Sequence, residues 1–154
     1  GYNLKITDIQ AALGLEQLKK IDSFARRRRQ NYNILLGELK SLEDYFDFQR
    51  PERGSRPSWF GFLITLKPGC PFTRGELVRF LHNRMIVTRM FLAGNILKQP
   101  YFRAYKIRHR VVGDLKDTDY VLRKSFWVGL YHGIGEKQCR YIAKSIKEFV
   151  RQSQ

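Results

Sequence analysis

The sequence predicts an α+β fold in which a helical arm precedes a small domain with a roughly three-stranded antiparallel sheet packed by helices. Two helical patterns open the chain, and a segment rich in proline, glycine and charge follows them. Short aromatic or β-branched segments then alternate with amphipathic helices, and a sheet with helices on one side is the simplest assembly of that order. We therefore expect an arm over residues 1–48, a linker over residues 49–57 and a small domain over residues 58–154.

The arm opens with a short polar loop that leads into a helix of small and apolar residues. Thr7 and Gln10 have the spacing of a capping box, which fixes the start of a helix over residues 8–20. This helix has almost no polar side, so we expect it to be buried by neighbours. A second helix is expected over residues 23–39, with Asp22 as its N-cap.

The segments after the linker predict three strands and three helices. We expect strands over residues 59–66, 85–88 and 126–130, and helices over residues 74–83, over residues 117–123 and from Glu136 onward. Residues 59–66 are apolar on both alternations, which is typical of a strand covered on both faces. The last helix has one apolar stripe at helical spacing and should face the core; the stripe is Cys139, Ile142, Ala143, Ile146, Phe149 and Val150.

The formal net charge of +15 raises the possibility of a basic nucleic-acid-binding module, which is one alternative reading of the chain. The four arginines at residues 26–29 argue against it, because successive side chains on a helix point about 100° apart and cannot form one face. A solvated surface fits these arginines better, and binding of a phosphorylated small molecule is the next choice. Nucleic acid is therefore not the expected partner.

Membrane insertion is not expected either. The longest apolar run, over residues 59–66, is far shorter than the ~20 residues that a helix needs to span a bilayer. No charged segment followed by an apolar one opens the chain, so we expect a cytoplasmic protein.

The chain offers no complete catalytic or metal site. Cys70 lies in a predicted turn and Cys139 in the stripe of the last helix, and the three histidines lack metal-ligand spacing. No glycine-rich phosphate loop and no nucleophile elbow is present. We expect no catalytic residue and no metal ligand in this chain, and His132, next to Tyr131 at a strand end, is the histidine that we place near a ligand.

Three segments resemble sugar aminotransferases of the DegT type, which are pyridoxal-phosphate enzymes of the aspartate aminotransferase fold (fold type I). Residues 1–18, GYNLKITDIQAALGLEQL, resemble the characteristic segment of that family. Residues 88–102, TRMFLAGNILKQPYF, and residues 125–131, SFWVGLY, resemble one branch of it, the CDP-4-keto-6-deoxy-D-glucose 3-dehydratases of deoxysugar and lipopolysaccharide biosynthesis. The resemblance covers essentially the whole chain, but only the C-terminal part of such an enzyme.

The resemblance implies a parent enzyme that uses pyridoxal or pyridoxamine phosphate, forms a homodimer and acts on a nucleotide sugar. The arm over residues 1–48 would then be a dimer-interface segment, with its first helix in the interior of the enzyme or at the dimer interface. The residues that grip the pyridoxal ring would then lie before Gly1, as would the cysteines that hold an iron–sulfur cluster in the dehydratase branch. The resemblance places Asn3 and Lys5 at the cofactor phosphate of the partner subunit. An amide and an ammonium group suit that role, since they offer a neutral donor and a cation to a dianion.

Six residues are predicted to bind the substrate: Arg89, Phe91, Asn95, Lys98, Tyr131 and His132. An arginine can pair with a diphosphate, an amide can hydrogen-bond sugar hydroxyls, and an aromatic ring supplies an apolar wall. Phe91 as ordinary core and Lys98 as solvated surface are the competing interpretations. The turn at residues 131–135, YHGIG, departs from the Tyr-Pro-Gly-Leu-Thr usual in the family and loses a threonine N-cap.

Two further alternatives stay open within the family reading. If the parent has a lysine that bonds to the pyridoxal ring, it is a nucleotide-sugar aminotransferase. If the parent is a dehydratase, it can have a reductase partner. Taken alone, these 154 residues are expected to be inactive.

Overall fold

The computed structural model describes Tyr2 and residues 4–154 of the chain. The elements follow one another as α1 (Asp8–Leu18), α2 (Ile21–Leu39), η1 (Lys40–Leu42), β1 (Phe46–Phe48), β2 (Gly61–Leu66), α3 (Arg74–Asn83), β3 (Thr88–Met90), η2 (Ile96–Lys98), α4 (Pro100–Ala104), α5 (Lys116–Lys124), β4 (Ser125–Gly129) and α6 (Glu136–Gln152). None of the described helices is long and apolar enough to cross a membrane. The predicted α+β class is confirmed.

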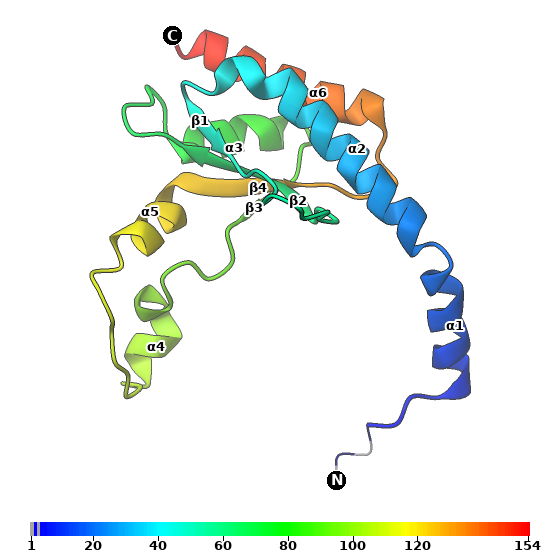
Figure 1. Cartoon of the computed structure of the whole chain (residues 1–154). Helices are drawn as coiled ribbons and strands as arrows, with labels where there is room; N and C mark the ends of the chain where they lie inside the picture. Colours follow the sequence, from blue (N-terminus) through cyan, green and yellow to red (C-terminus); the bar gives the residue numbers. More distant parts are fainter. Residues whose placement is uncertain (1, 3) are drawn as a thin grey trace.

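The described strands form one antiparallel sheet in the order β1-β2-β4-β3. Three of them were expected, and β1 is a fourth that the sequence pattern did not predict. Phe46 and Phe48 of β1 pair with Leu66 and Ile64 of β2, so their rings join the core beside the predicted strand. Figure 1 shows α2, α3 and α6 on one side of this sheet and the shorter α4 and α5 on the other.

The main core lies between the sheet and the layer of α2, α3 and α6. Along β2 the side chains alternate strictly, with Phe62, Ile64 and Leu66 buried and the residues between them partly exposed. The prediction that this strand is covered on both faces is therefore wrong, because α5 covers only part of the second face. All six residues of the predicted stripe on α6 are buried, which confirms that helix as a core element.

Residues on both sides of the predicted linker contribute to this core. Tyr32, Leu35 and Leu39 of α2 are buried together with the apolar residues of the sheet and of α6. The side chain of Tyr32 also stacks on Trp59, with ring centroids 4.2 Å apart. The division of the chain into an arm, a linker and a small domain that are separate structural units stays a prediction.

Helix α1 projects away from the sheet (Figure 1) and is not buried by any described part of the chain. Its capping box is confirmed, since the Thr7 amide donates to Gln10 Oε1 at 3.0 Å and the Gln10 amide donates to Thr7 Oγ1 at 3.4 Å. Ile9 is 84% exposed in the described chain, so the expected burial of this helix in a larger enzyme or against a partner subunit stays a prediction. Small and apolar residues indicate that this helix has a covered face, and no described part of the chain covers it.

Two predicted boundaries also differ from the structure. Helix α2 begins at Ile21, so Asp22 lies within its first turn and Lys20 takes the N-cap position without a side-chain cap. Strand β3 begins at Thr88 and not at Met85, because Met85 takes a left-handed backbone conformation with φ of 59° after the end of α3. The Met85 amide donates to the carbonyl of His82 at 2.9 Å, which completes this turn.

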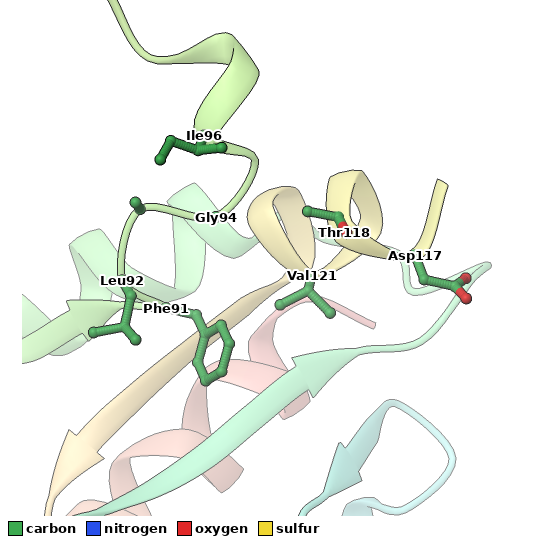
Figure 2. A pocket seen from close by; sticks show the side chains of 8 residues that line it. Phe91, Leu92, Gly94, Ile96, Asp117, Thr118 and Val121 are labelled. Carbon is green, nitrogen blue, oxygen red and sulfur yellow. The ribbon is translucent and has the colours of Figure 1, made fainter. Parts of the chain in front are cut away.

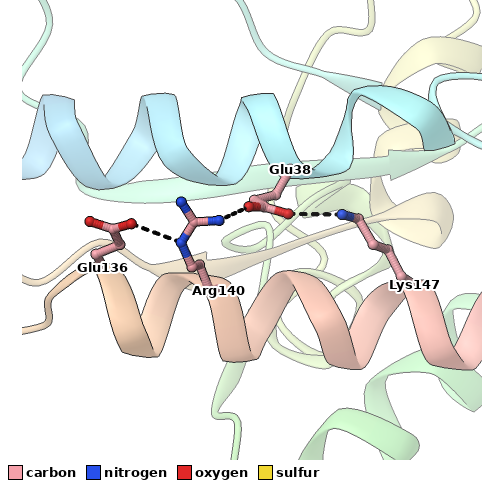
Figure 3. A network of polar contacts seen from close by, with 4 residues as sticks. All are labelled: Glu38, Glu136, Arg140 and Lys147. Atoms are coloured by element: carbon pink, nitrogen blue, oxygen red, sulfur yellow. Dashed lines mark hydrogen bonds and ion pairs between the residues drawn. The ribbon is translucent and has the colours of Figure 1, made fainter.

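Helices α2 and α6 are also joined by a row of charged side chains (Figure 3). The carboxylate of Glu38 accepts hydrogen bonds from Arg140 and from Lys147 Nζ, the latter at 2.9 Å, and Arg140 Nε donates to Glu136 at 2.8 Å. Lys147 first, and Arg140 after it, lowers the pKa of the Glu38 carboxyl below its ordinary value of 4.5. The ionised form of Glu38 is therefore favoured in the folded chain.

This network predicts a specific acid dependence of stability. A carboxyl whose pKa is lower in the folded state stabilises the fold above its unfolded pKa, and this contribution is lost as the pH falls through the folded pKa. We expect Glu38→Gln to lower the urea midpoint at pH 7, and we expect its difference from the unmodified chain to shrink as the pH falls below 4.5. Glu52→Gln is the control, because the Glu52 carboxylate has no partner among the described residues. A difference that stays constant with pH would refute the role of Glu38.

Candidate functional site

The face of the sheet opposite α2 and α6 carries a row of side chains across three strands. Arg89 of β3 and Leu63 of β2 both lie directly opposite Trp127 of β4. Directly opposite residues of paired strands point to the same face, so these three side chains share it. Trp127 is only partly buried there, whereas its neighbours Phe126 and Val128 point into the core.

Trp127 can lie across the sheet because Gly61 provides the space. A Cβ atom at Gly61 would lie closer to Trp127 Cε3 than real Cβ atoms come to their neighbours. The Trp127 ring also lies 4.9 Å from the ring of Phe60, between centroids. This face of the sheet therefore presents a broad aromatic surface.

Two hollows adjoin this surface. The first has a volume of about 550 Å³ and lies between the segment after β3 and the start of α5; it is lined by Phe91, Leu92, Ala93, Gly94, Ile96, Asp117, Thr118 and Val121. Figure 2 shows the residues of the β3–η2 segment on one side of this hollow and the three residues of α5 on the other. Its lining is largely apolar.

The second hollow has a volume of about 290 Å³ and lies over the sheet itself. Its lining comes from the loop before β2, from the sheet and from the segment after β3; it comprises Gln49, Pro57, Ser58, Trp59, Phe60, Gly61, Leu63, Phe91, Leu92 and Trp127. Phe91 and Leu92 line both hollows and separate them. Both tryptophans of the chain line the second hollow.

The segment between β3 and α4 is held to α5 by a polar cluster. Asn95 Nδ2 donates to Asp119 Oδ1 at 2.8 Å, and Lys98 Nζ forms an ion pair with Asp119 Oδ2 at 2.7 Å. These hydrogen bonds, that of Lys98 first, lower the pKa of the Asp119 carboxyl. Asn95 is only 4% exposed, and its Oδ1 accepts from the Leu97 amide, so both ends of its amide group already have partners.

The predicted substrate residues lie in different places. Arg89 is exposed, and its guanidinium makes no hydrogen bond or ion pair with any described residue. Phe91 is 38% exposed and lines both hollows, whereas Asn95 and Lys98 stabilise the wall beside it through Asp119. These four residues therefore share one region of the structure.

Tyr131 and His132 do not line either hollow around Phe91. The His132 ring stacks on Phe24 of α2 with centroids 3.6 Å apart, and its Nδ1 atom is buried without a hydrogen-bond partner among the described residues. Asn31 of α2 donates to the carbonyls of Tyr131 and Ile134, so the turn is fixed against α2.

The two predicted cofactor residues lie at the start of the chain. Asn3 is outside the described residues. Lys5 is exposed on the segment before α1 and has no ion pair or hydrogen bond with the described part of the chain. Its ammonium group is therefore available to a phosphate, although it lies on a different element from the two hollows. No group of three or more His, Cys, Asp or Glu residues among those described could hold a metal ion.

Sequence reasoning missed several residues of this region. Trp59, Phe60 and Trp127 form its aromatic surface, and Thr118 and Val121 of α5 complete the first hollow. The alternation of Phe126, Trp127 and Val128 along one strand was the available signal, because a large side chain between two core residues points to the opposite face.

Comparison with known proteins supports the family resemblance found in the sequence. Residues 1–147 match the DegT/DnrJ/EryC1/StrS aminotransferase family. The chain is 42% identical over 97% of its length to the lipopolysaccharide biosynthesis protein RfbH of Salmonella typhimurium, and covers 34% of that protein. It is 44% identical over 99% of its length to the dTDP-4-dehydro-2,6-dideoxy-D-glucose 3-dehydratase of Saccharopolyspora spinosa, and covers 32% of that enzyme.

Solved structures support the same assignment. The GDP-4-keto-6-deoxy-D-mannose-3-dehydratase of E. coli with bound hydrated PLP aligns with a TM-score of 0.84 at 28% identity, over 95% of this chain and 36% of that one. A more distant relative is the dTDP-4-amino-4,6-dideoxy-D-glucose transaminase of Shigella dysenteriae, which is 26% identical over 96% of this chain and of which the chain covers 39%. The chain spans about a third of the length of the 3-dehydratases it matches. This chain belongs to the DegT/DnrJ/EryC1/StrS aminotransferase family, whose fold is that of the type I pyridoxal-phosphate enzymes.

Proposed function

We propose that the chain is the C-terminal part of a pyridoxamine-phosphate-dependent CDP-4-keto-6-deoxy-D-glucose 3-dehydratase of deoxysugar and lipopolysaccharide O-antigen biosynthesis. The observation that carries this proposal is the aromatic surface around Phe91 and Trp127, in segments that resemble the dehydratase branch. The 44% identity to a nucleotide-sugar 3-dehydratase supports it, since the transaminase relative is only 26% identical. The choice of CDP over GDP or dTDP rests on the resemblance of residues 88–102 and 125–131.

The chemistry of the surface suits a nucleotide sugar. Phe91 and Trp127 offer ring faces to the flat base and to the apolar side of the hexose. Arg89 lies opposite Trp127 in the sheet, and its guanidinium has no partner among the described residues, so it is free to pair with the diphosphate. Asn95 and Lys98 act through Asp119 by holding the segment that carries Phe91.

Lys5 and Asn3 would hold the phosphate of the cofactor that is bound by the partner subunit. The exposed ammonium of Lys5, which has no partner among the described residues, fits that anion. Bound pyridoxamine phosphate would supply an electron sink for loss of the C3 hydroxyl. A homodimer, a cytoplasmic location, an iron–sulfur cluster held outside this chain and a reductase partner belong to the same proposal.

A nucleotide-sugar aminotransferase is the second candidate, because a transaminase is among the relatives. The two reactions differ in their products. A dehydratase removes the C3 hydroxyl and keeps oxygen at C4, whereas an aminotransferase keeps the C3 hydroxyl and replaces the C4 oxygen with an amine.

The full-length protein should be incubated with CDP-, GDP- and dTDP-4-keto-6-deoxyhexoses, with pyridoxamine phosphate and a reducing system in one arm and pyridoxal phosphate and an amino donor in the other. We expect a 3-deoxy product in the first arm, formed fastest from the CDP sugar. A 4-amino sugar as the main product would replace the proposal with the aminotransferase. No turnover of any of these sugars in either arm would overturn both.

A further inference from the structure

A group of arginines on α2 and the following loop surrounds a polar hollow on another part of the surface. This hollow has a volume of about 400 Å³ and is lined by Asp22, Ala25, Arg26, Arg29 and Arg56. Its lining therefore carries three guanidinium groups and a single carboxylate. None of the three arginines forms an ion pair with any described residue.

Helix geometry brings two of these arginines together. Residues three apart on a helix lie on the same side of it, so Arg26 and Arg29 are neighbours on α2. Arg27 points in a different direction, because successive residues are about 100° apart. The hollow thus uses two members of the run of four arginines.

The third arginine is held beside α2 by the loop that carries it. Tyr32, one turn after Arg29, fixes both ends of this loop: its hydroxyl donates to the carbonyl of Gln49, and its ring stacks on Trp59 at 4.2 Å with planes 12° apart. Within the loop, the Ser55 amide donates to the carbonyl of Glu52 at 3.0 Å and forms a turn just before Arg56. Arg56 is therefore held opposite Arg26 and Arg29 by a loop that is tied down at both ends.

Three guanidinium groups around one hollow repel one another, and an anion with several oxygens would relieve that repulsion. Guanidinium groups bind phosphate oxygens through paired N–H donors, which favours a phosphate over a halide or a single carboxylate. Nucleic acid requires cations spread along an extended stripe, whereas these arginines converge on one concave site. Independently of the proposed function, we infer that this hollow binds the phosphate or diphosphate group of a small molecule.

Calorimetric titration of the protein with inorganic pyrophosphate at low salt tests this site. We expect saturable binding that weakens as salt is added, and we expect Arg26→Gln combined with Arg29→Gln to weaken it by roughly tenfold or more. Arg79→Gln combined with Arg151→Gln is the matched control, because it removes the same charge from exposed positions on α3 and α6. This control should change the affinity less than twofold.

Arg56→Gln is the second variant, since it changes one exposed loop residue and leaves α2 intact. It should also weaken pyrophosphate binding, with an unchanged thermal unfolding temperature. Equal losses in the α2 variant and in the control would mean a general charge effect and would overturn the site, as would the absence of saturable binding. A single-stranded oligonucleotide that binds more tightly than pyrophosphate and responds equally to both double variants would instead identify a nucleic-acid surface.

Discussion

Phe62→Ala is expected to lower the free energy of unfolding by about 3–5 kcal/mol, which is the usual cost of removing a large aromatic side chain from a core. The Phe62 side chain is completely buried, with its ring 5.3 Å from that of Tyr32 and 5.4 Å from that of Phe48, between centroids. It thus joins β2 to α2 and to the neighbouring strand β1. Because whole domains are stable by only about 5–15 kcal/mol, this single change should remove much of the stability. Urea unfolding followed by circular dichroism measures it.

Phe60 provides the matched control for this loss. It lies two residues earlier, is 70% exposed and contacts Trp127 on the opposite face of the sheet. Phe60→Ala should cost less than about 1 kcal/mol, because little buried surface is lost. Equal losses in the two variants would contradict the placement of the core on the side of α2 and α6.

Gly94→Ala is expected to destabilise the β3–η2 segment by about 1–3 kcal/mol and to distort the first hollow. Gly94 has a φ of 58°, in the left-handed region, and a Cβ atom there would come within 2.9 Å of Leu122 Cβ on α5. Either the segment or α5 must shift to admit the methyl group. Thermal unfolding measures the loss of stability, and the accessibility of Phe91 and Val121 by side-chain NMR measures the change in the hollow.

Two further variants separate steric from backbone effects. Gly113 has a φ of 77° but no atom within 4 Å of a Cβ position, so Gly113→Ala should show only the cost of the left-handed backbone. Gly94→Ala alone should change the chemical shifts of the residues that line the first hollow. In the double variant Gly94→Ala with Leu122→Ala, these chemical shifts should return part of the way to their original values. If Gly94→Ala and Gly113→Ala have the same effect, close packing against Leu122 does not hold the segment.

Elements with strong local signals could be predicted from the sequence. The apolar stripe on α6 and the capping box at Thr7 depend on residues three or four apart, and both are found in the structure. Strand β1 could not be predicted in the same way, because its three residues gain their stability from pairing with β2, about 18 positions later in the chain.

The contacts within the candidate site could not be predicted from the sequence either, because they join residues that are distant in the chain. Phe91 and Arg89 could be proposed from a resemblance, but their relation to Trp127 depends on the register between β3 and β4. Asn95 and Lys98 looked like free polar groups in the sequence. Only the fold shows that both side chains donate hydrogen bonds to the carboxylate of Asp119 on α5. The exposure of α1 was also beyond the sequence, since apolar composition indicates that a helix has a covered face but not what covers it.

The central claim is that the sheet face around Phe91 and Trp127 binds the nucleotide sugar, and the affinity of the full-length protein for CDP-glucose tests it most directly. Calorimetry should show that Trp127→Ala weakens this affinity by roughly tenfold or more. Tyr141→Ala, which removes an exposed aromatic side chain from α6 on the opposite side of the sheet, should leave the affinity within about twofold of its original value. An affinity that is unchanged by Trp127→Ala would contradict the claim.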